Sequence, residues 1–335
     1  MKINYHDTTR KTTITSFLKE WESNDDFISA TTSGSTGQPK KIELKKEHLL
    51  ISARKTLDYL KIPDFSVFHL GLSSDTIAGK MMLVRALVNQ AELIVSEVSA
   101  NCLASIKTPI QFSALVPLQL EKYLSENQQI VVDTIIVGGA PISEQLEKMA
   151  TLNKSNIYHT FGMTETISHV AMRKLTNEHK NPYHALPGIE FSQNTLKELV
   201  IHFPEINTSP IATNDVVDLL DKFTFNWIGR TDFCVNSGGI KIFPENIERR
   251  LDLFIPLPYF ISHIPDVHLG QALVLIIESK EAIVLDKTAF SNFLSSYETP
   301  RYYQCIPNFT KTASGKINRT ITQAKISNDA WRKIL

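Results

Sequence analysis

The chain has 335 residues, 42% hydrophobic and 21% charged, and its 35 basic residues balance 35 acidic ones. A length of this order predicts two domains rather than one. Because the net charge is zero, we expect no general attraction to nucleic acid or to an anionic membrane, and small molecules are the expected partners. No stretch approaches the roughly 18 apolar residues of a membrane span. The three cysteines lack CxxC spacing, which argues against a zinc site and indicates a reducing, cytoplasmic setting.

Short β-rich runs alternate with helical patterns over residues 27–161, which predicts a parallel sheet flanked by helices. The apolar residues of 46–60 fall on one helical face, and shorter helices are predicted at 118–124 and 142–152. The predicted strands cover residues 27–31, 66–70, 92–95, 111–116, 134–137 and 156–160.

The character of the sequence changes after Pro187. Successive β-rich segments without helices predict an antiparallel or barrel-like portion over about residues 187–231. A further unit follows, with a helix that begins at Pro244, strands near 259–263 and 272–277, and a helix near 287–295. The sequence therefore predicts an α/β fold with a large amino-terminal domain over residues 1–231, including the β-rich subdomain, and a small α+β carboxyl-terminal domain over residues 232–335.

A loop rich in glycine and hydroxyl residues lies between two predicted strands and runs from Thr31 to Lys40. Glycines let the backbone approach a ligand, the hydroxyls and amides can donate to phosphate oxygens, and Lys40 supplies a positive charge. The spacing differs from a Walker loop, because no Lys-Ser/Thr pair follows the second glycine. We expect a triphosphate site here, with an ordinary Ser/Gly turn as the alternative. The predicted phosphate-binding residues are Thr32, Ser33, Gly34, Ser35, Thr36, Gly37 and Lys40.

Two more clusters follow predicted strands, where ligands of open α/β sheets usually bind. Glu165 is a candidate Mg²⁺ ligand together with Thr164, since Mg²⁺ commonly takes only one or two protein oxygens. The strand predicted at 134–137 is followed by Gly138, Gly139 and Ala140. The two glycines would let a flat base lie against the backbone. An ordinary turn is the alternative in both places.

Charged residues of the second half supply three further candidates. Asp215 and Arg230 lie about one β-hairpin apart and could meet, where they would bind ribose hydroxyls or form only a surface salt bridge. Lys316 lies in a loop of small residues, a setting in which most lysines are solvated surface charges. A glycine turn with a lysine consists of Gly238, Gly239 and Lys241.

In this order the motifs resemble the adenylate-forming superfamily of acyl-CoA synthetases, peptide synthetase adenylation domains and luciferases. The resemblance implies ATP, Mg²⁺ and CoA as ligands, with a carboxylic acid as the other substrate. Residues 32–40 resemble its phosphate loop, 161–165 its adenine and magnesium motif, 213–215 its ribose motif, 229–232 its hinge, 238–244 its thioester loop and 314–316 its catalytic-lysine loop.

The resemblance carries roles to individual residues. It implies catalysis by Lys316, Thr164 and Glu165, and a hinge at Asp232. The implied nucleotide contacts also include Phe161, Gly162 and Met163, and the residues implied for the CoA step are Gly238, Gly239 and Lys241.

Within the superfamily, residues 77–87 and 162–169 resemble the o-succinylbenzoate-CoA ligases of menaquinone biosynthesis, in a short form. This acid keeps a second carboxylate after activation, and that group needs a buried cation. Lys80 or Arg85 could supply the cation, while Ser168 and His169 are further candidates for contact with the acid. A lysine that snorkels to solvent is the alternative at Lys80.

The sequence departs from the family pattern in two places. Only thirty residues precede Thr31, so much of the family's first subdomain is expected to be missing or minimal, and Asn214 stands where glycine is usual. Three rival functions stay open: another acyl- or aryl-CoA ligase, an enzyme that passes its acyl group to a carrier protein, and a non-catalytic nucleotide-binding homologue. The oligomeric state is also open.

Overall fold

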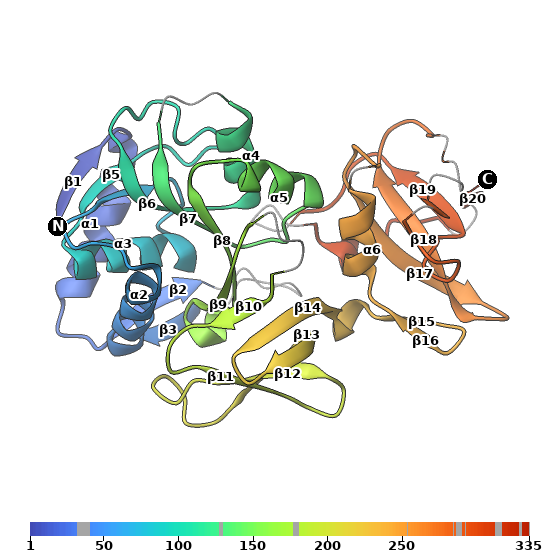
Figure 1. The fold of residues 1–335 in the computed structure, drawn as a ribbon. Coiled ribbons are helices and arrows are strands. Elements are labelled where there is room, and N and C mark those ends of the chain that lie inside the picture. The colour runs from blue at the N-terminus through green and yellow to red at the C-terminus, as the bar shows by residue number, and fades with distance from the viewer. Residues whose placement is uncertain are drawn as a thin grey trace.

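The computed structural model describes residues 1–31, 41–126, 130–176, 181–252, 254–283, 285, 290–291, 293–311, 317–327 and 330–334. A 12-stranded sheet dominates the amino-terminal two thirds (Figure 1). Its strands in chain order are β1 (Lys2–Tyr5), β4 (Val67–Leu70), β5 (Glu92–Val95), β6 (Ile110–Leu115), β7 (Val132–Val137), β8 (Asn156–Gly162), β9 (His169–Lys174), β10 (Tyr183–Ala185), β11 (Glu190–Gln193), β12 (Glu198–His202), β13 (Ile211–Asp221) and β14 (Thr224–Arg230). No helix in these ranges is long and apolar enough to cross a membrane.

One half of this sheet is parallel, in the spatial order β1-β5-β4-β6-β7-β8. Its strands bury apolar side chains on both faces, as expected where helices cover both faces of a parallel sheet. One face packs against α1 (Lys11–Glu22), α2 (Lys46–Leu60) and α3 (Ile77–Asn89), the other against α4 (Pro117–Ser125) and α5 (Glu144–Thr151). The predicted α/β class is confirmed.

The strand predicted at 27–31 is present as β2 (Phe27–Thr31), but its expected place in the parallel sheet is wrong. It pairs antiparallel with β3 (Lys41–Lys45) in a separate two-stranded sheet. The connection over residues 32–40 is too short for the crossover of a dozen or more residues that parallel neighbours require. The edge of the parallel half is instead formed by β1, whose role the sequence did not reveal.

The other half of the sheet is antiparallel and continues from β8 in the order β9-β10-β14-β13-β12-β11. This confirms the predicted helix-free antiparallel portion. The strands form an open extension of the large sheet rather than a barrel, because the hydrogen-bonded path ends at β11 without closing.

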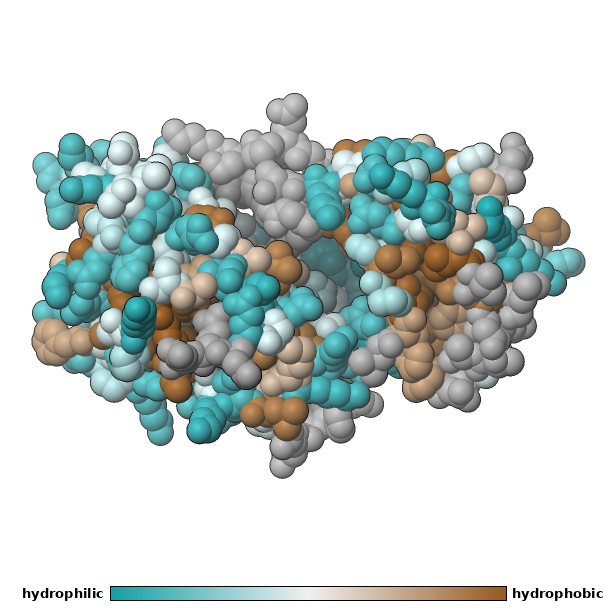
Figure 2. Space-filling model, turned by 90° about the horizontal axis from the view of Figure 1, so that it is seen from above, coloured by the Kyte–Doolittle hydropathy of each residue, from teal (hydrophilic) through white to brown (hydrophobic). Residues whose placement is uncertain are grey.

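The carboxyl-terminal third forms a six-stranded sheet. Its elements are β15 (Val235–Ser237), β16 (Ile240–Ile242), α6 (Pro244–Leu251), β17 (Tyr259–Asp266), β18 (Gly270–Glu278), β19 (Tyr302–Ile306), α8 (Arg319–Gln323) and β20 (Arg332–Lys333). Helix α6 begins with Pro244 at its first turn, as predicted, while much of the predicted helix 287–295 lies outside the described residues. Seen from above, the surface is hollowed between this third and the rest of the molecule (Figure 2).

A buried arginine ties the first residues to the parallel half. Arg10 ends the short 3-10 helix η1 (Thr8–Arg10) and is 7% exposed. Its guanidinium donates to the carbonyl oxygens of Leu70 at 2.8 Å and Ser96 at 2.6 Å, and also to that of Leu72. These carbonyls lie at or just after the ends of β4 and β5, where the Leu70 carbonyl also accepts from the Ser96 amide at 3.3 Å. Arg10 therefore satisfies the strand ends that precede α3.

Replacing Arg10 by Met should lower the free energy of unfolding by about 3 kcal/mol, because three buried carbonyls lose a charged donor. Urea denaturation followed by circular dichroism would measure the change. The exposed neighbour Lys11 supplies the control Lys11→Met. If Arg10→Met lowered the free energy of unfolding by no more than the control does, this role of Arg10 would be contradicted.

A buried acidic side chain joins α6 to the large sheet. Glu245 is 8% exposed, and its carboxylate lies so close to β14 that a Cβ added to Gly229 would come within 2.9 Å of Oε2. Burial raises the pKa of Glu245 to about 7, while the charge of Arg319 works in the opposite direction. The folded protein therefore holds this proton more tightly than the unfolded chain does.

Stability should consequently depend on Glu245 between pH 5 and pH 8. Because the folded pKa is raised, the stabilising contribution is complete below the unfolded pKa near 4.5 and is lost as the pH rises through about 7. The stability advantage of Glu245→Gln over the unmodified protein should grow by about 2 kcal/mol over that interval. Urea denaturation at several pH values measures this difference, with the exposed Glu281→Gln as control. A pH-independent difference would contradict the assignment.

Candidate active site

The carboxyl ends of β7 and β8 lie side by side and hold the first group of predicted site residues. Thr160 donates from Oγ1 to the carbonyl oxygen of Val137 at 3.0 Å. A Cβ added to Gly138 would lie 2.5 Å from that Oγ1, and Gly139 has φ of +87°, so both positions favour glycine. The structure thus brings the turn 138–140 next to the segment 160–163, and both contain residues that the sequence analysis names as candidates for an adenine site.

A buried histidine fixes this pair of strand ends. His159 Nε2 lies 3.1 Å from the carbonyl oxygen of Ala140, and Nδ1 lies 2.6 Å from the hydroxyl of Tyr183. Burial lowers the pKa of His159 to about 3, assisted by the charge of Arg173. The ring is therefore neutral at physiological pH and acts as a structural bridge between β8, β10 and the turn after β7.

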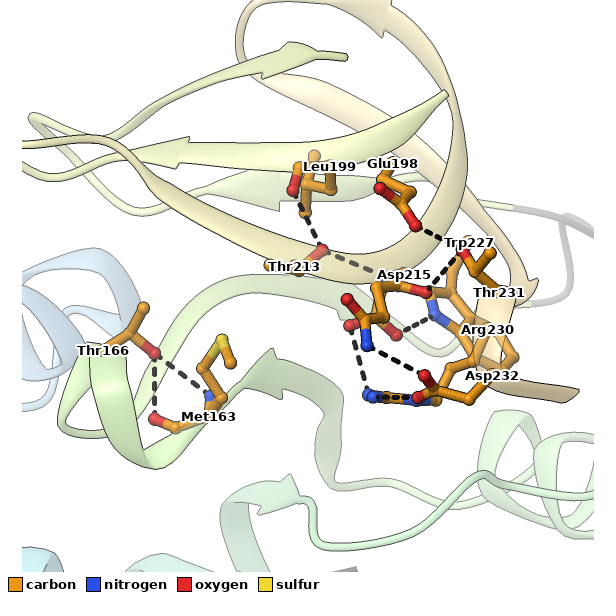
Figure 3. A network of polar contacts seen from close by, with 11 residues as sticks. Met163, Thr166, Glu198, Leu199, Thr213, Asp215, Trp227, Arg230, Thr231 and Asp232 are labelled. Atoms are coloured by element: carbon orange, nitrogen blue, oxygen red, sulfur yellow. Dashed lines mark hydrogen bonds and ion pairs between the residues drawn. The ribbon is translucent and has the colours of Figure 1, made fainter. Parts of the chain in front are cut away.

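The chain turns sharply after β8. A short 3-10 helix η2 (Thr164–Thr166) is closed by the side chain of Thr166, which accepts from the Met163 amide at 3.1 Å (Figure 3) and donates to the Ser168 carbonyl at 2.7 Å. Ile167 follows with φ of +68° and ψ of −51°, and the Ser168 amide bonds the Thr166 carbonyl across it. This γ-turn is strained for a β-branched residue, at a cost of about 1–3 kcal/mol.

The strained turn separates Thr164 and Glu165, which line a pocket, from Ser168 and His169, which face α3 and α2. Thr164 and Glu165 line a pocket of about 240 Å³, together with Glu43, His48 and Asn207 among others. Glu165 is exposed there. Hard oxygen donors of this kind suit Mg²⁺, and no group of three or more His, Cys, Asp or Glu side chains with metal-binding geometry occurs in the described part of the chain. Thr164 and Glu165 are the residues that would hold such an ion, since Mg²⁺ commonly takes only one or two protein oxygens.

Asp215 and Arg230 meet as the sequence predicted (Figure 3). They are paired across β13 and β14, with Arg230 NH1 3.6 Å from Asp215 Oδ2. The other Asp215 oxygen accepts from Trp227 Nε1 at 2.8 Å. Burial raises the pKa of Asp215, and the bond from Trp227 and the charge of Arg230 oppose that effect. Trp227 is a site residue that sequence reasoning missed.

The predicted hinge residue belongs to the same network. Asp232 accepts from Arg230 NH2 at 2.6 Å through one carboxylate oxygen and from Asn214 Nδ2 at 2.8 Å through the other. Asn214 thus has a function that the glycine usual at this position could not perform. Asp232 lies in the short 3-10 helix η3 (Thr231–Phe233) between β14 and β15, at the passage from the large sheet to the carboxyl-terminal sheet.

Arg85 lies in α3 and is only 2% exposed. Its Nη2 donates to Ser168 Oγ at 3.0 Å, whereas its Nε has no hydrogen-bond partner among the residues that the structure describes. It makes no ion pair with any residue of the described ranges. Burial lowers the pKa of Arg85 to about 9, which still leaves it charged near neutrality. Within the described part of the chain, Arg85 is thus a buried cation without an anionic partner.

Ser168 and His169 lie beside Arg85, so these three predicted acid-site residues are brought together. Lys80 is not part of this group. Its Nζ donates to the Ser29 carbonyl at 2.6 Å and lies 5.7 Å from the centroid of the Phe17 ring. Residues 80 and 85 are five positions apart and so project from different faces of α3. Lys80 anchors β2 and neighbours α1 instead of facing the Arg85 cluster.

The remaining predicted residues divide into two sets. Gly238 and Gly239, with φ of +59° and +82°, form the two-residue turn between β15 and β16, and Lys241 is exposed on β16. The predicted phosphate loop with Thr32, Ser33, Gly34, Ser35, Thr36, Gly37 and Lys40, and the predicted catalytic Lys316, lie outside the described residues.

Comparison with known proteins shows the family to which the chain is similar. A family model described as AMP-binding enzyme matches residues 7–192. The 2-succinylbenzoate-CoA ligase of Staphylococcus epidermidis is 26% identical over 331 residues, which cover 89% of this chain and 69% of that protein. An acyl-CoA synthetase (AMP-forming)/AMP-acid ligase II-like protein from Dyadobacter fermentans is 33% identical, with a TM-score of 0.61 and 93% of each chain covered.

The fold is shared with more distant structures. An o-succinylbenzoate CoA synthetase from Bacillus subtilis, solved with its acyl-adenylate intermediate, has a TM-score of 0.79 at 19% identity, over 92% of this chain and 69% of that one. Together with the convergence of the predicted motifs at the carboxyl ends of β7 and β8, the family match decides the classification. The chain belongs to the AMP-binding enzyme family and is an AMP-forming ligase of the acyl-CoA synthetase type.

Proposed function

We propose that this enzyme activates o-succinylbenzoate as its acyl adenylate and transfers the acyl group to CoA, a reaction of menaquinone biosynthesis. The observation that carries the proposal is the buried charge of Arg85. An isolated buried cation is costly, and it is expected where an anionic ligand neutralises it. o-Succinylbenzoate has two carboxylates, so one can react while the other pairs with Arg85.

The surroundings of Arg85 support a carboxylate partner from the substrate. His169 cannot supply negative charge, and burial together with the nearby charge of Arg85 lowers its pKa well below the ordinary value, so it does not add positive charge either. Ser168 offers one neutral oxygen, and the Nε donor of Arg85 stays available. A planar guanidinium whose Nε is unpaired among the described residues matches the geometry of a carboxylate. The rigid ring carboxylate suits this anchor, while the flexible succinyl carboxylate is free to react.

The first half-reaction joins the acid to AMP. A succinyl carboxylate oxygen attacks the α-phosphorus of ATP, the bond from that phosphorus to the bridging oxygen breaks, and pyrophosphate leaves. We assign ribose hydroxyl contacts to Asp215 and Arg230, adenine contacts to the segments 138–140 and 161–163, and phosphate contacts to the loop 32–40. Mg²⁺ held by Glu165 would offset phosphate charge, and Lys316 would stabilise the charge that develops in the transition state.

The second half-reaction transfers the acyl group to a thiol. The CoA thiol loses its proton, its sulfur attacks the acyl carbon, the bond from that carbon to the phosphate oxygen breaks, and AMP leaves. We propose that residues 232–335 move as a domain about Asp232 between the two steps, withdrawing Lys316 and presenting Gly238, Gly239 and Lys241. The bonds of Asp232 to Arg230 and Asn214 support a hinge whose position is coupled to the nucleotide site.

Replacing Arg85 by Met tests the acid assignment. With o-succinylbenzoate, kcat/KM in ATP–pyrophosphate exchange should fall about 100-fold, because a charged, desolvated pair is lost. With 4-oxo-4-phenylbutanoate, which lacks the ring carboxylate, kcat/KM should not change. Without ligand, the variant should be more stable by about 2 kcal/mol in urea denaturation, since an unpaired buried charge has been removed.

Lys80→Met is the matched control on the same helix. It should retain the preference for o-succinylbenzoate over 4-oxo-4-phenylbutanoate, whatever its effect on overall rate. If Lys80→Met lost the preference for o-succinylbenzoate and Arg85→Met kept it, the second carboxylate would pair with Lys80. Our assignment to Arg85 would then be wrong.

Lys316→Ala tests the division into two steps. Pyrophosphate exchange should fall at least about 100-fold, because the transition state of adenylation loses its cation. CoA-dependent consumption of preformed acyl adenylate, followed by AMP release, should persist. An equal loss in both assays would contradict a movement of residues 232–335 that withdraws Lys316 before thioester formation.

A further inference from the structure

We propose that Thr56 is a positioning residue for the acid site: it fixes the tautomer of His169 and, through Ser168, the orientation of Arg85. This inference rests on the proposed function. Thr56 lies in α2, belongs to none of the sequence motifs and is 0% exposed. It reaches across the fold to the first residue of β9, which follows the strained turn at Ile167.

The direction of the Thr56 hydrogen bonds is fixed by the helix. Its Oγ1 donates to the carbonyl oxygen of Ser52, one turn earlier in α2, at 3.0 Å. The same Oγ1 lies 2.9 Å from His169 Nε2. A hydroxyl has only one hydrogen, and that hydrogen points to Ser52. His169 must therefore donate from Nε2 to Thr56.

This bond determines that Nδ1, on the other side of the histidine ring, carries no hydrogen. Burial is the main cause that lowers the pKa of His169 far below its ordinary value, so the ring is neutral and carries a single N–H. With the hydrogen at Nε2, Nδ1 is an acceptor. Ser168 Oγ lies 3.4 Å from Nδ1 and donates to it, which leaves its lone pairs for Arg85 NH2 at 3.0 Å.

Every donor in this series points the same way, from Arg85 through Ser168 and His169 to Thr56 and the backbone of α2. Without the Thr56 hydroxyl, a buried Nε2–H would have no acceptor, so the Nδ1–H tautomer becomes favourable. Ser168 Oγ would then face two donors, the imidazole and the guanidinium. The bond that orients Arg85 weakens, although the charge of Arg85 stays in place.

The kinetic test compares Thr56→Val, which keeps the shape of the side chain, with Thr56→Ser, which keeps the hydroxyl. For Thr56→Val, KM for o-succinylbenzoate in pyrophosphate exchange should rise about tenfold with little change in kcat, and KM for ATP should stay the same. Exchange with 4-oxo-4-phenylbutanoate should be unaffected, and Thr56→Ser should behave like the unmodified enzyme. A loss of equal size for both acids would indicate only a packing defect and would overturn the proposal.

A second measurement does not depend on the identity of the acid. In the ¹⁵N-labelled protein, the imidazole nitrogens of His169, assigned by their loss in His169→Gln, should show the proton on Nε2, and Thr56→Val should move it to Nδ1. A proton on Nδ1 in the unmodified protein would overturn the proposed series of bonds. If the enzyme does not activate o-succinylbenzoate, the proposed function fails, while the tautomer of His169 still decides whether Thr56 directs this network.

Discussion

The buried charge of Arg85 is the constraint on which the proposed acid site depends. The side chain is 2% exposed, receives no anionic partner from the described residues, and its Nε donor finds no acceptor among them. A fold can retain such a group when ligand binding offsets its cost, which is a common trade between stability and function. The neighbours of Arg85 leave its charge to be neutralised by a ligand, since His169 is kept neutral and Ser168 supplies only a hydroxyl oxygen.

The sheet explains how distant motifs reach one place. Parallel strands end at a common edge, so the turns after β7 and β8 are adjacent. The reversal after β8 passes through the strained Ile167, which sends Thr164 and Glu165 to one pocket and Ser168 and His169 toward α2 and α3. The antiparallel strands then place Asp215 opposite Arg230, next to the passage into the carboxyl-terminal sheet.

Much of this could be predicted because local patterns determine it. The apolar periodicity of residues 46–60 gave the bounds of α2 directly, and the hairpin spacing predicted the meeting of Asp215 with Arg230. The assignment of residues 27–31 to the parallel sheet failed because strand propensity does not identify the partner strand. Likewise, no local pattern decides between Lys80 and Arg85, since the distinction depends on the Ser29 carbonyl and on Ser168. Thr56 was beyond prediction because its contact lies 113 positions away.

The central claim is that a second carboxylate neutralises Arg85, and the acid preference of the unmodified enzyme tests it most directly. ATP–pyrophosphate exchange would be measured with o-succinylbenzoate and with monocarboxylic acids of similar size. We expect o-succinylbenzoate to be preferred in kcat/KM by at least about 100-fold, which corresponds to the free energy of one buried charge-assisted pair. Equal exchange with acids that have a single carboxylate would contradict it.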